Sequence, residues 1–207
     1  MPSGRTHDRI TLWSLPWVVL LSFLLTRNGE LTLIVAASYL FSGLMFGPDL
    51  DIHSVQFKRW GVFRRIWLPY QKTLSHRSWF SHGPIIGTTV RVLYFLCLLF
   101  LVAILVVAIA QLFIGFAWNW QTFFKNLGRW IAFDYRSEAI ALFLGLELGA
   151  MSHSLSDWIG SSYKRYQRQG WKGVLPKSKK KRSQKRSPRQ TNQKRSRSNS
   201  SGRKTRK

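Results

Sequence analysis

The sequence has very little cysteine and few acidic residues. The shortage of cysteine excludes two kinds of stabilising framework, and the shortage of acids makes the chain strongly basic. Its 207 residues contain one cysteine, Cys97, which excludes a disulfide framework and a cysteine-ligated zinc site. Only 8 residues are acidic against 32 Lys and Arg, so the formal net charge is +24. No acid follows residue 160, so the composition changes along the chain and its two parts need separate treatment.

The C-terminal part, residues 166–207, is predicted to be a disordered basic cytoplasmic tail. From Lys177 to Lys207 it consists almost entirely of Lys, Arg, Ser, Gln and Asn, and has almost no apolar surface to bury. Such a tail binds anionic lipid headgroups or nucleic acid through counterion release, without sequence specificity. Residues 1–165 are predicted to form a separate, membrane-embedded domain.

Long uncharged runs dominate residues 1–165 and predict an all-α membrane protein. The run Val92–Trp118 has 27 residues without a charge, which exceeds the roughly 20 that a helix needs to cross a bilayer core. Shorter segments predicted to span are Ile10–Thr26, Leu31–Gly47 and Ala139–Ile159. The predicted fold is therefore a polytopic helical bundle of about four transmembrane helices.

Two alternatives apply to the first spans: a buried soluble hairpin of helices, and a cleaved signal peptide. The hairpin is disfavoured because the intervening loops are short and no amphipathic helices are predicted to cover it. Cleavage is disfavoured because the first run is longer than a usual signal and no small-residue cleavage site precedes Arg27.

Basic residues predict the orientation in the membrane. The 48–83 connection carries six Lys and Arg, whereas the turn at 27–30 has only Arg27 beside Glu30. Because Lys and Arg accumulate in cytoplasmic loops, both termini and the 48–83 connection are predicted to be cytoplasmic. Within that connection, Val55–Pro69 interleaves aromatic residues with paired cations, which predicts an interfacial helix that buries Trp60 and Trp67 among lipid headgroups.

All five histidines lie at this predicted cytoplasmic face, and several acids accompany them. His153 and Asp157 are four residues apart, so a helix would project them from one face. An extended segment after Pro48 would direct Asp49, Asp51 and His53 to one side. The candidate metal ligands are His7, Asp49, Asp51, His53, His76, His82, His153 and Asp157.

This ligand set predicts divalent metal. Imidazole and carboxylate donors without thiolate suit zinc, with manganese or iron(II) as alternatives. A zinc ion takes about four ligands, so eight candidates predict two or more ions. Each residue also has a simpler explanation: His153 and Asp157 could be a hydrogen-bonded pair, the acids near Pro48 a helix-ending turn, and His7 a solvated residue. Metal binding is favoured because it explains their common placement at once.

Four motifs resemble those of a family of bacterial, largely cyanobacterial, membrane proteins described as predicted metal-binding proteins. The motifs are Pro2–Asp8, Gly47–Asp51, His76–Gly83 and His153–Asp157, and the resemblance covers about residues 1–165. It implies a multi-pass protein of the bacterial inner membrane. The motif order is also similar to the YdjM-type inner-membrane metal-dependent hydrolases. More remotely it resembles the zinc-dependent phospholipase C and single-strand nuclease group, helical enzymes whose zinc cluster cleaves phosphoesters. That group has an N-terminal Trp and a further His-x-x-x-Asp helix that are not found here, so two ions are expected rather than three.

The predicted function is a metal-dependent hydrolase acting on phosphoester-like substrates at the cytoplasmic face. Arg77 is expected either to pair with phosphate oxygens or to anchor in headgroups, and Glu147 to be either a buried general base or a polar lock between helices. Asp8 is expected to orient His7. The alternative is a non-catalytic membrane metal-binding or scaffold protein, whose protein partners the sequence does not reveal. A transporter is disfavoured because the ligands lie at one face rather than at the midplane.

Overall fold

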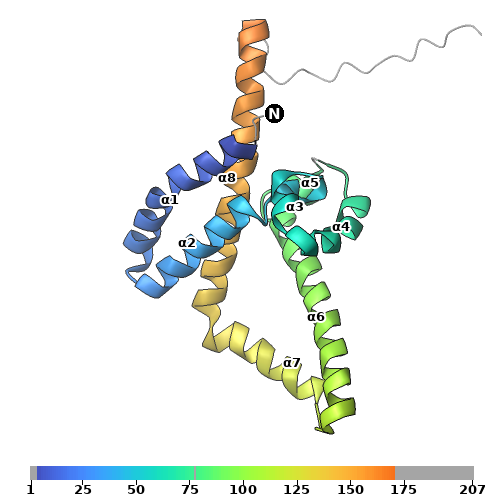
Figure 1. Cartoon of the computed structure of the whole chain (residues 1–207). Helices are drawn as coiled ribbons and strands as arrows, with labels where there is room; N and C mark the ends of the chain where they lie inside the picture. Colours follow the sequence, from blue (N-terminus) through green and yellow to red (C-terminus); the bar gives the residue numbers. More distant parts are fainter. Residues whose placement is uncertain (1–3, 77, 171–207) are drawn as a thin grey trace, which may run out of the picture. The chain divides into compact units, whose positions relative to one another are not determined.

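The computed structural model describes residues 4–76 and 78–170, which fall within one compact unit, Met1–Val174. Within these ranges the chain is helical and has no strand (Figure 1). The elements are α1 (Gly4–Thr26), α2 (Gly29–Leu44), the 3-10 helix η1 (Pro48–Asp51), α3 (Val55–Arg59), the 3-10 helix η2 (Gly61–Trp67), α4 (Leu68–Thr73), α5 (Trp79–His82), α6 (Ile86–Ile114), α7 (Trp120–Arg129), the π-helical turn η3 (Trp130–Asp134) and α8 (Arg136–Gln169).

Four helices in the described part, α1, α2, α6 and α8, are long and apolar enough to cross a membrane. At this level the predicted all-helical fold is confirmed. The predicted tail lies outside the described residues, except that α8 continues through the expected boundary at residue 165 to Gln169. The third span was predicted to run to Trp118, but α6 ends at Ile114 because Gly115 adopts the left-handed conformation (φ 70°) that stops helices.

The closest packing of long helices joins α2 to α8 through small residues. A side chain at Gly145 would collide with Ser38, and a Cβ at Gly149 would come within 2.5 Å of the Tyr39 carbonyl oxygen. The buried Ser42 hydroxyl adds a hydrogen bond of 2.5 Å to the carbonyl of Leu146. Small residues let the backbones approach closely, as is common between membrane helices. This contact fixes the end of α2 against the part of α8 that carries His153.

A buried aromatic cluster supports the chain between α2 and α6. Its core consists of Phe46, Leu50, Phe57, Trp67, Tyr70 and Leu146. Trp67 is fully buried and stacks on Phe95 of α6. Burial raises the pKa of Tyr70 to about 12.

The prediction of one interfacial helix over Val55–Pro69 is therefore wrong in two respects. The segment is divided into short helices, α3, η2 and the start of α4, with a break at Gly61, whose φ is 54°. Trp67 packs inside the protein rather than among headgroups, whereas Arg64 and Arg65 are exposed. The aromatic residues of the segment therefore divide, because Trp67 faces the core whereas Phe63 is exposed beside Arg64 and Arg65.

Candidate metal centre

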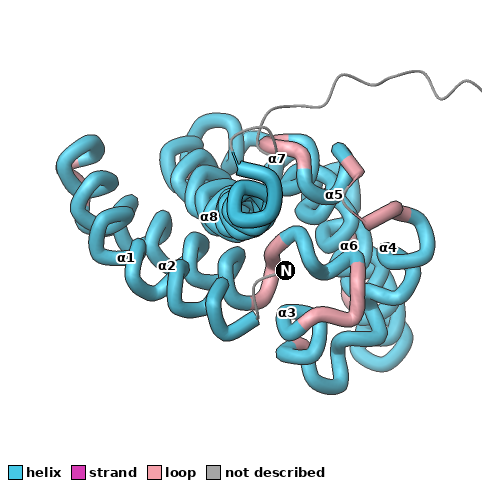
Figure 2. Tube along the Cα trace, turned by 90° about the horizontal axis from the view of Figure 1, so that it is seen from above, coloured by secondary structure: helices cyan, strands magenta, loops and turns pink. Residues whose placement is uncertain are grey.

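The predicted ligands come from five elements that meet near the start of α1. His7 lies in the first turns of α1, and Asp49 and Asp51 lie in η1, directly after α2. His82 ends α5, whereas His76 lies in the turn before it, and α8 supplies His153 and Asp157. Figure 2 shows the start of α1 beside α8 and α3, and residues of all three line one cavity.

One donor group consists of His7, His153 and Asp157. One ligand atom from each lies within 4.8 Å of the others, and His7 Nε2 is 3.3 Å from Asp157 Oδ1. The His7 and His153 rings stack with centroids 4.0 Å apart. The spacing of four residues on α8 does place His153 and Asp157 toward the same partner.

A second donor group consists of Asp49, His76 and His82, with ligand atoms again within 4.8 Å of one another. Asp49 Oδ1 is 3.6 Å from His82 Nε2, and the two histidine rings meet edge to face at 5.2 Å. The Pro48 turn and the chain before α6 therefore supply a site that is distinct from the first but adjacent to it.

Asp49 connects the two groups. Its Oδ2 lies 3.2 Å from His153 Nε2, while its Oδ1 faces His82. Ligands placed tetrahedrally at about 2.1 Å from one ion are separated by about 3.4 Å. The measured separations, 3.2, 3.3 and 3.6 Å, agree with that value. Asp49 thus lies between the two donor groups, with one carboxylate oxygen toward each.

Unpaired buried atoms provide a second test of whether metal fits these residues. Among the residues that the structure describes, several buried atoms that could ligate a metal have no hydrogen-bond partner. They include Asp49 Oδ1, Asp51 Oδ2, His76 Nε2, His82 Nε2, His153 Nε2 and Asp157 Oδ1. Four of them, Asp49 Oδ1, His82 Nε2, His153 Nε2 and Asp157 Oδ1, lie 3.2–3.6 Å from a His or Asp atom but form no hydrogen bond with it. Unsatisfied lone pairs that converge from several elements are instead the arrangement that a divalent cation requires.

Three of the imidazole rings are oriented by hydrogen bonds to the ring nitrogen that faces away from the centre. His7 Nδ1 lies 2.5 Å from Ser156 Oγ, His82 Nδ1 lies 2.8 Å from Ser81 Oγ, and His76 Nδ1 lies 2.9 Å from Asp51 Oδ1. Each bond engages Nδ1 and leaves Nε2 of the same ring for the centre, as is usual around metal-bound histidine.

The two serines were not identified from the sequence. Their adjacency to ligands was the only signal, since Ser81 precedes His82 and Ser156 precedes Asp157. Asp8, which was expected to orient His7, instead forms an ion pair of 2.5 Å with Arg59.

The remaining predicted residues lie around the two groups rather than within them. Asp51 supports His76, because Pro48–Asp51 forms a 3-10 helix and not the extended strand that was expected to align its side chains. His53 is exposed, with its ring tilted against Phe57. Glu147 accepts a hydrogen bond of 2.9 Å from the backbone N–H of Ile85, which links α8 to the start of α6. Arg77 lies outside the described residues.

A cavity of about 250 Å³ opens over the first group and Asp49. His7, Asp49, His153 and Asp157 line it, together with His53 and Lys58. The centre therefore has an accessible side, whereas a purely structural zinc site is closed by its four protein ligands.

Replacing Ser156 with alanine is expected to weaken metal binding without changing the fold. The loss of the bond to His7 Nδ1 would free the ring to rotate, and such changes cost about 10- to 100-fold in metal affinity. Competition with a chelating dye measures this. Ser161→Ala is the control, because the Ser161 hydroxyl bonds only the Trp158 carbonyl on the same helix. Equal affinities for the two variants would contradict the orienting role.

Comparisons with known proteins give one match. No curated protein and no solved structure matches the chain significantly. A family model described as uncharacterized metal-binding protein (DUF2227) matches residues 2–167. This range contains every residue of the two donor groups, and it covers three of the four helices long enough to cross a membrane completely and α8 up to residue 167. The chain therefore belongs to this family of metal-binding proteins.

Proposed function

We propose that the protein is an integral membrane hydrolase that uses two divalent ions, with zinc as the best fit, to cleave phosphoesters at the cytoplasmic face. The observation that supports this most is the position of Asp49 between the two donor groups, which is that of a bridging carboxylate. His7, His153 and Asp157 would hold one ion, and His76 and His82 the other. Two ions so held would lower the pKa of a water molecule and stabilise the charge on phosphoester oxygens.

The chain's own residues supply the rest of the site. Ser156, Ser81 and Asp51 fix the imidazole rings, so that the donors need little rearrangement. Lys58 lines the open cavity and would attract an anionic substrate. The basic tail would add attraction to anionic lipid at the membrane surface.

The second candidate is a non-catalytic scaffold whose ions fasten the helix ends. The donors do come from five elements, which fits that role. The cavity over Asp49 favours catalysis, because a scaffold has no need of an open side.

Hydrolysis of nitrophenyl phosphate mono- and diesters by full-length protein in detergent, with zinc or manganese supplied, tests the proposal. We expect turnover that needs metal. Lys58→Ala should reduce kcat/KM roughly two- to fivefold, the effect of one exposed charge. Lys72→Ala is the matched control, since Lys72 is also exposed but does not line the cavity. Absence of turnover with every metal would favour the scaffold.

A further inference from the structure

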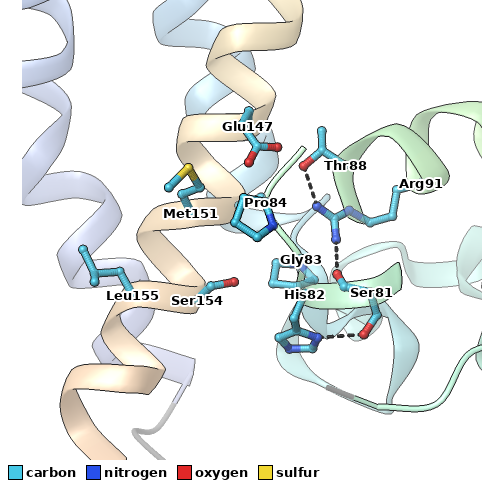
Figure 3. Close-up of a pocket in the computed structure, with 12 residues that line it drawn as sticks. Ser81, His82, Gly83, Pro84, Thr88, Arg91, Glu147, Met151, Ser154 and Leu155 are labelled. Carbon is cyan, nitrogen blue, oxygen red and sulfur yellow. Dashed lines mark hydrogen bonds between the residues drawn. The ribbon is translucent and has the colours of Figure 1, made fainter. Parts of the chain in front are cut away.

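A second cavity, of about 200 Å³, adjoins the metal centre through His82 (Figure 3). It lies where α5, the start of α6 and the middle of α8 meet. Its polar lining includes Ser81, His82, Arg91, Glu147 and Ser154, and its apolar lining includes Pro84, Met151 and Leu155. This cavity could not be predicted from the sequence, because its walls come from segments far apart in the chain.

Two oppositely charged side chains are buried in this wall. Arg91 is 1% exposed and Glu147 is 7% exposed. Arg91 donates from Nη1 to the Ser81 carbonyl at 2.9 Å and from Nη2 to the Thr88 hydroxyl at 3.0 Å. The two side chains attract each other electrostatically, which offsets part of the cost of burying them, although the described residues show no direct ion pair between them.

Glu147 keeps one oxygen unused. Its Oε1 accepts from the Ile85 N–H, whereas its Oε2 is buried and has no hydrogen-bond partner among the described residues. A buried carboxylate oxygen without a partner is costly, so this position favours an occupant that donates a hydrogen bond. Figure 3 shows the Glu147 carboxylate and the Ser154 hydroxyl on one side of α8, both directed toward the segment that carries Pro84 and His82.

The charges of Arg91 and Glu147 determine which kind of hydrogen-bond donor the cavity favours. An ammonium group would be repelled by the Arg91 guanidinium, which lines the same cavity. A neutral hydroxyl can donate to Glu147 Oε2 without facing that repulsion. The volume is below the roughly 300 Å³ at which pockets for drug-sized ligands begin, so it suits a small polar fragment rather than a whole ligand.

We propose that this cavity binds a hydroxyl group of the substrate, so that the preferred substrates are polyol- or sugar-type phosphoesters whose phosphoryl group lies at the metal centre. The assignment rests on the proposed function, because it places the hydroxyl relative to a bound phosphoryl group. Glu147 is then a substrate-binding residue, and Arg91 positions Ser81, whose hydroxyl orients His82.

Binding of two phosphonates to the metal-loaded, full-length protein in detergent tests the proposal without requiring turnover. Dihydroxybutylphosphonate and butylphosphonate differ only in the hydroxyls, and neither has an ester to hydrolyse. Isothermal titration calorimetry should show the dihydroxy compound binding at least about tenfold more tightly, as expected for a hydrogen bond to a charged group. In Glu147→Gln this preference should fall below about threefold, because the glutamine can keep the bond from Ile85 but no longer offers a charged acceptor.

The matched control is Glu138→Gln, which changes an acid on the same helix outside the cavity and should retain the full preference. Metal content should be unchanged in both variants, because neither acid belongs to a donor group. Equal affinity for the two phosphonates, or failure to bind either, would overturn the hydroxyl site. Hydrolysis of nitrophenyl phosphates despite such a result would leave the proposed function standing, and a hydroxyl preference without any hydrolysis would leave only the binding site.

Discussion

Replacing Asp49 with alanine is expected to remove both ions, whereas His82→Ala or His153→Ala removes one. The reason is that Asp49 Oδ1 faces His82 and Asp49 Oδ2 faces His153, so a single substitution takes a ligand from each group. Losing one ligand leaves a divalent charge under-coordinated beside surroundings of low dielectric. Metal-to-protein ratios of the detergent-purified variants, measured by inductively coupled plasma mass spectrometry, would show the difference.

Two controls accompany this measurement. Asp134→Ala removes an exposed carboxylate that belongs to neither donor group and should retain all the metal. Deletion of residues 177–207 should also leave the ratio unchanged, because that segment has no His, Asp, Glu or Cys. Metal at the full-length level in Asp49→Ala would exclude the bridging role, and a loss equal to that in His153→Ala would indicate two independent sites.

Those parts of the metal centre that lie within one helix or turn could be predicted from the local sequence. The spacing of His153 and Asp157 needs only helical geometry, and both contribute to the same group. Pro48 follows shortly after α2, so the acids beyond it lie at the end of a span. The Lys and Arg residues and three of the histidines both lie in the 48–83 connection, so both patterns pointed to the same segment. These features depend on residues close in sequence.

The positions of the other residues depend on tertiary contacts and could not be predicted from the local sequence. The third span was predicted to begin at Val92, directly after Arg91. In the structure Arg91 lies inside α6 and is buried, because the Ser81 carbonyl and the Thr88 hydroxyl accept its hydrogen bonds. The contact between Asp51 and His76 likewise depends on a turn that folds back from residues after α4. No periodicity in the sequence reveals such partners.

Removal of metal is expected to abolish hydrolysis while the helices remain formed. The donors lie in the first turns of α1, in the connection between α2 and α6, and within α8, so bound ions would fasten one region of the protein. The backbone hydrogen bonds of membrane helices are satisfied within each helix and do not depend on that region. Stability should still fall, by about 4 kcal/mol for each ion present at 1,000 times its dissociation constant.

Chelation of the full-length protein, followed by circular dichroism, thermal unfolding and a nitrophenyl phosphate assay, separates the two candidate functions. The hydrolase predicts that turnover disappears, that the helical signal at room temperature persists, and that the melting temperature falls; added zinc should restore turnover and melting temperature together. Asp49→Ala is the internal control, since a protein that no longer holds the ions should not respond to the chelator. Cooperative loss of helix on chelation, in a protein that never showed turnover, would mean that the ions serve to hold the bundle together. The open cavity beside Asp49 would then need another explanation.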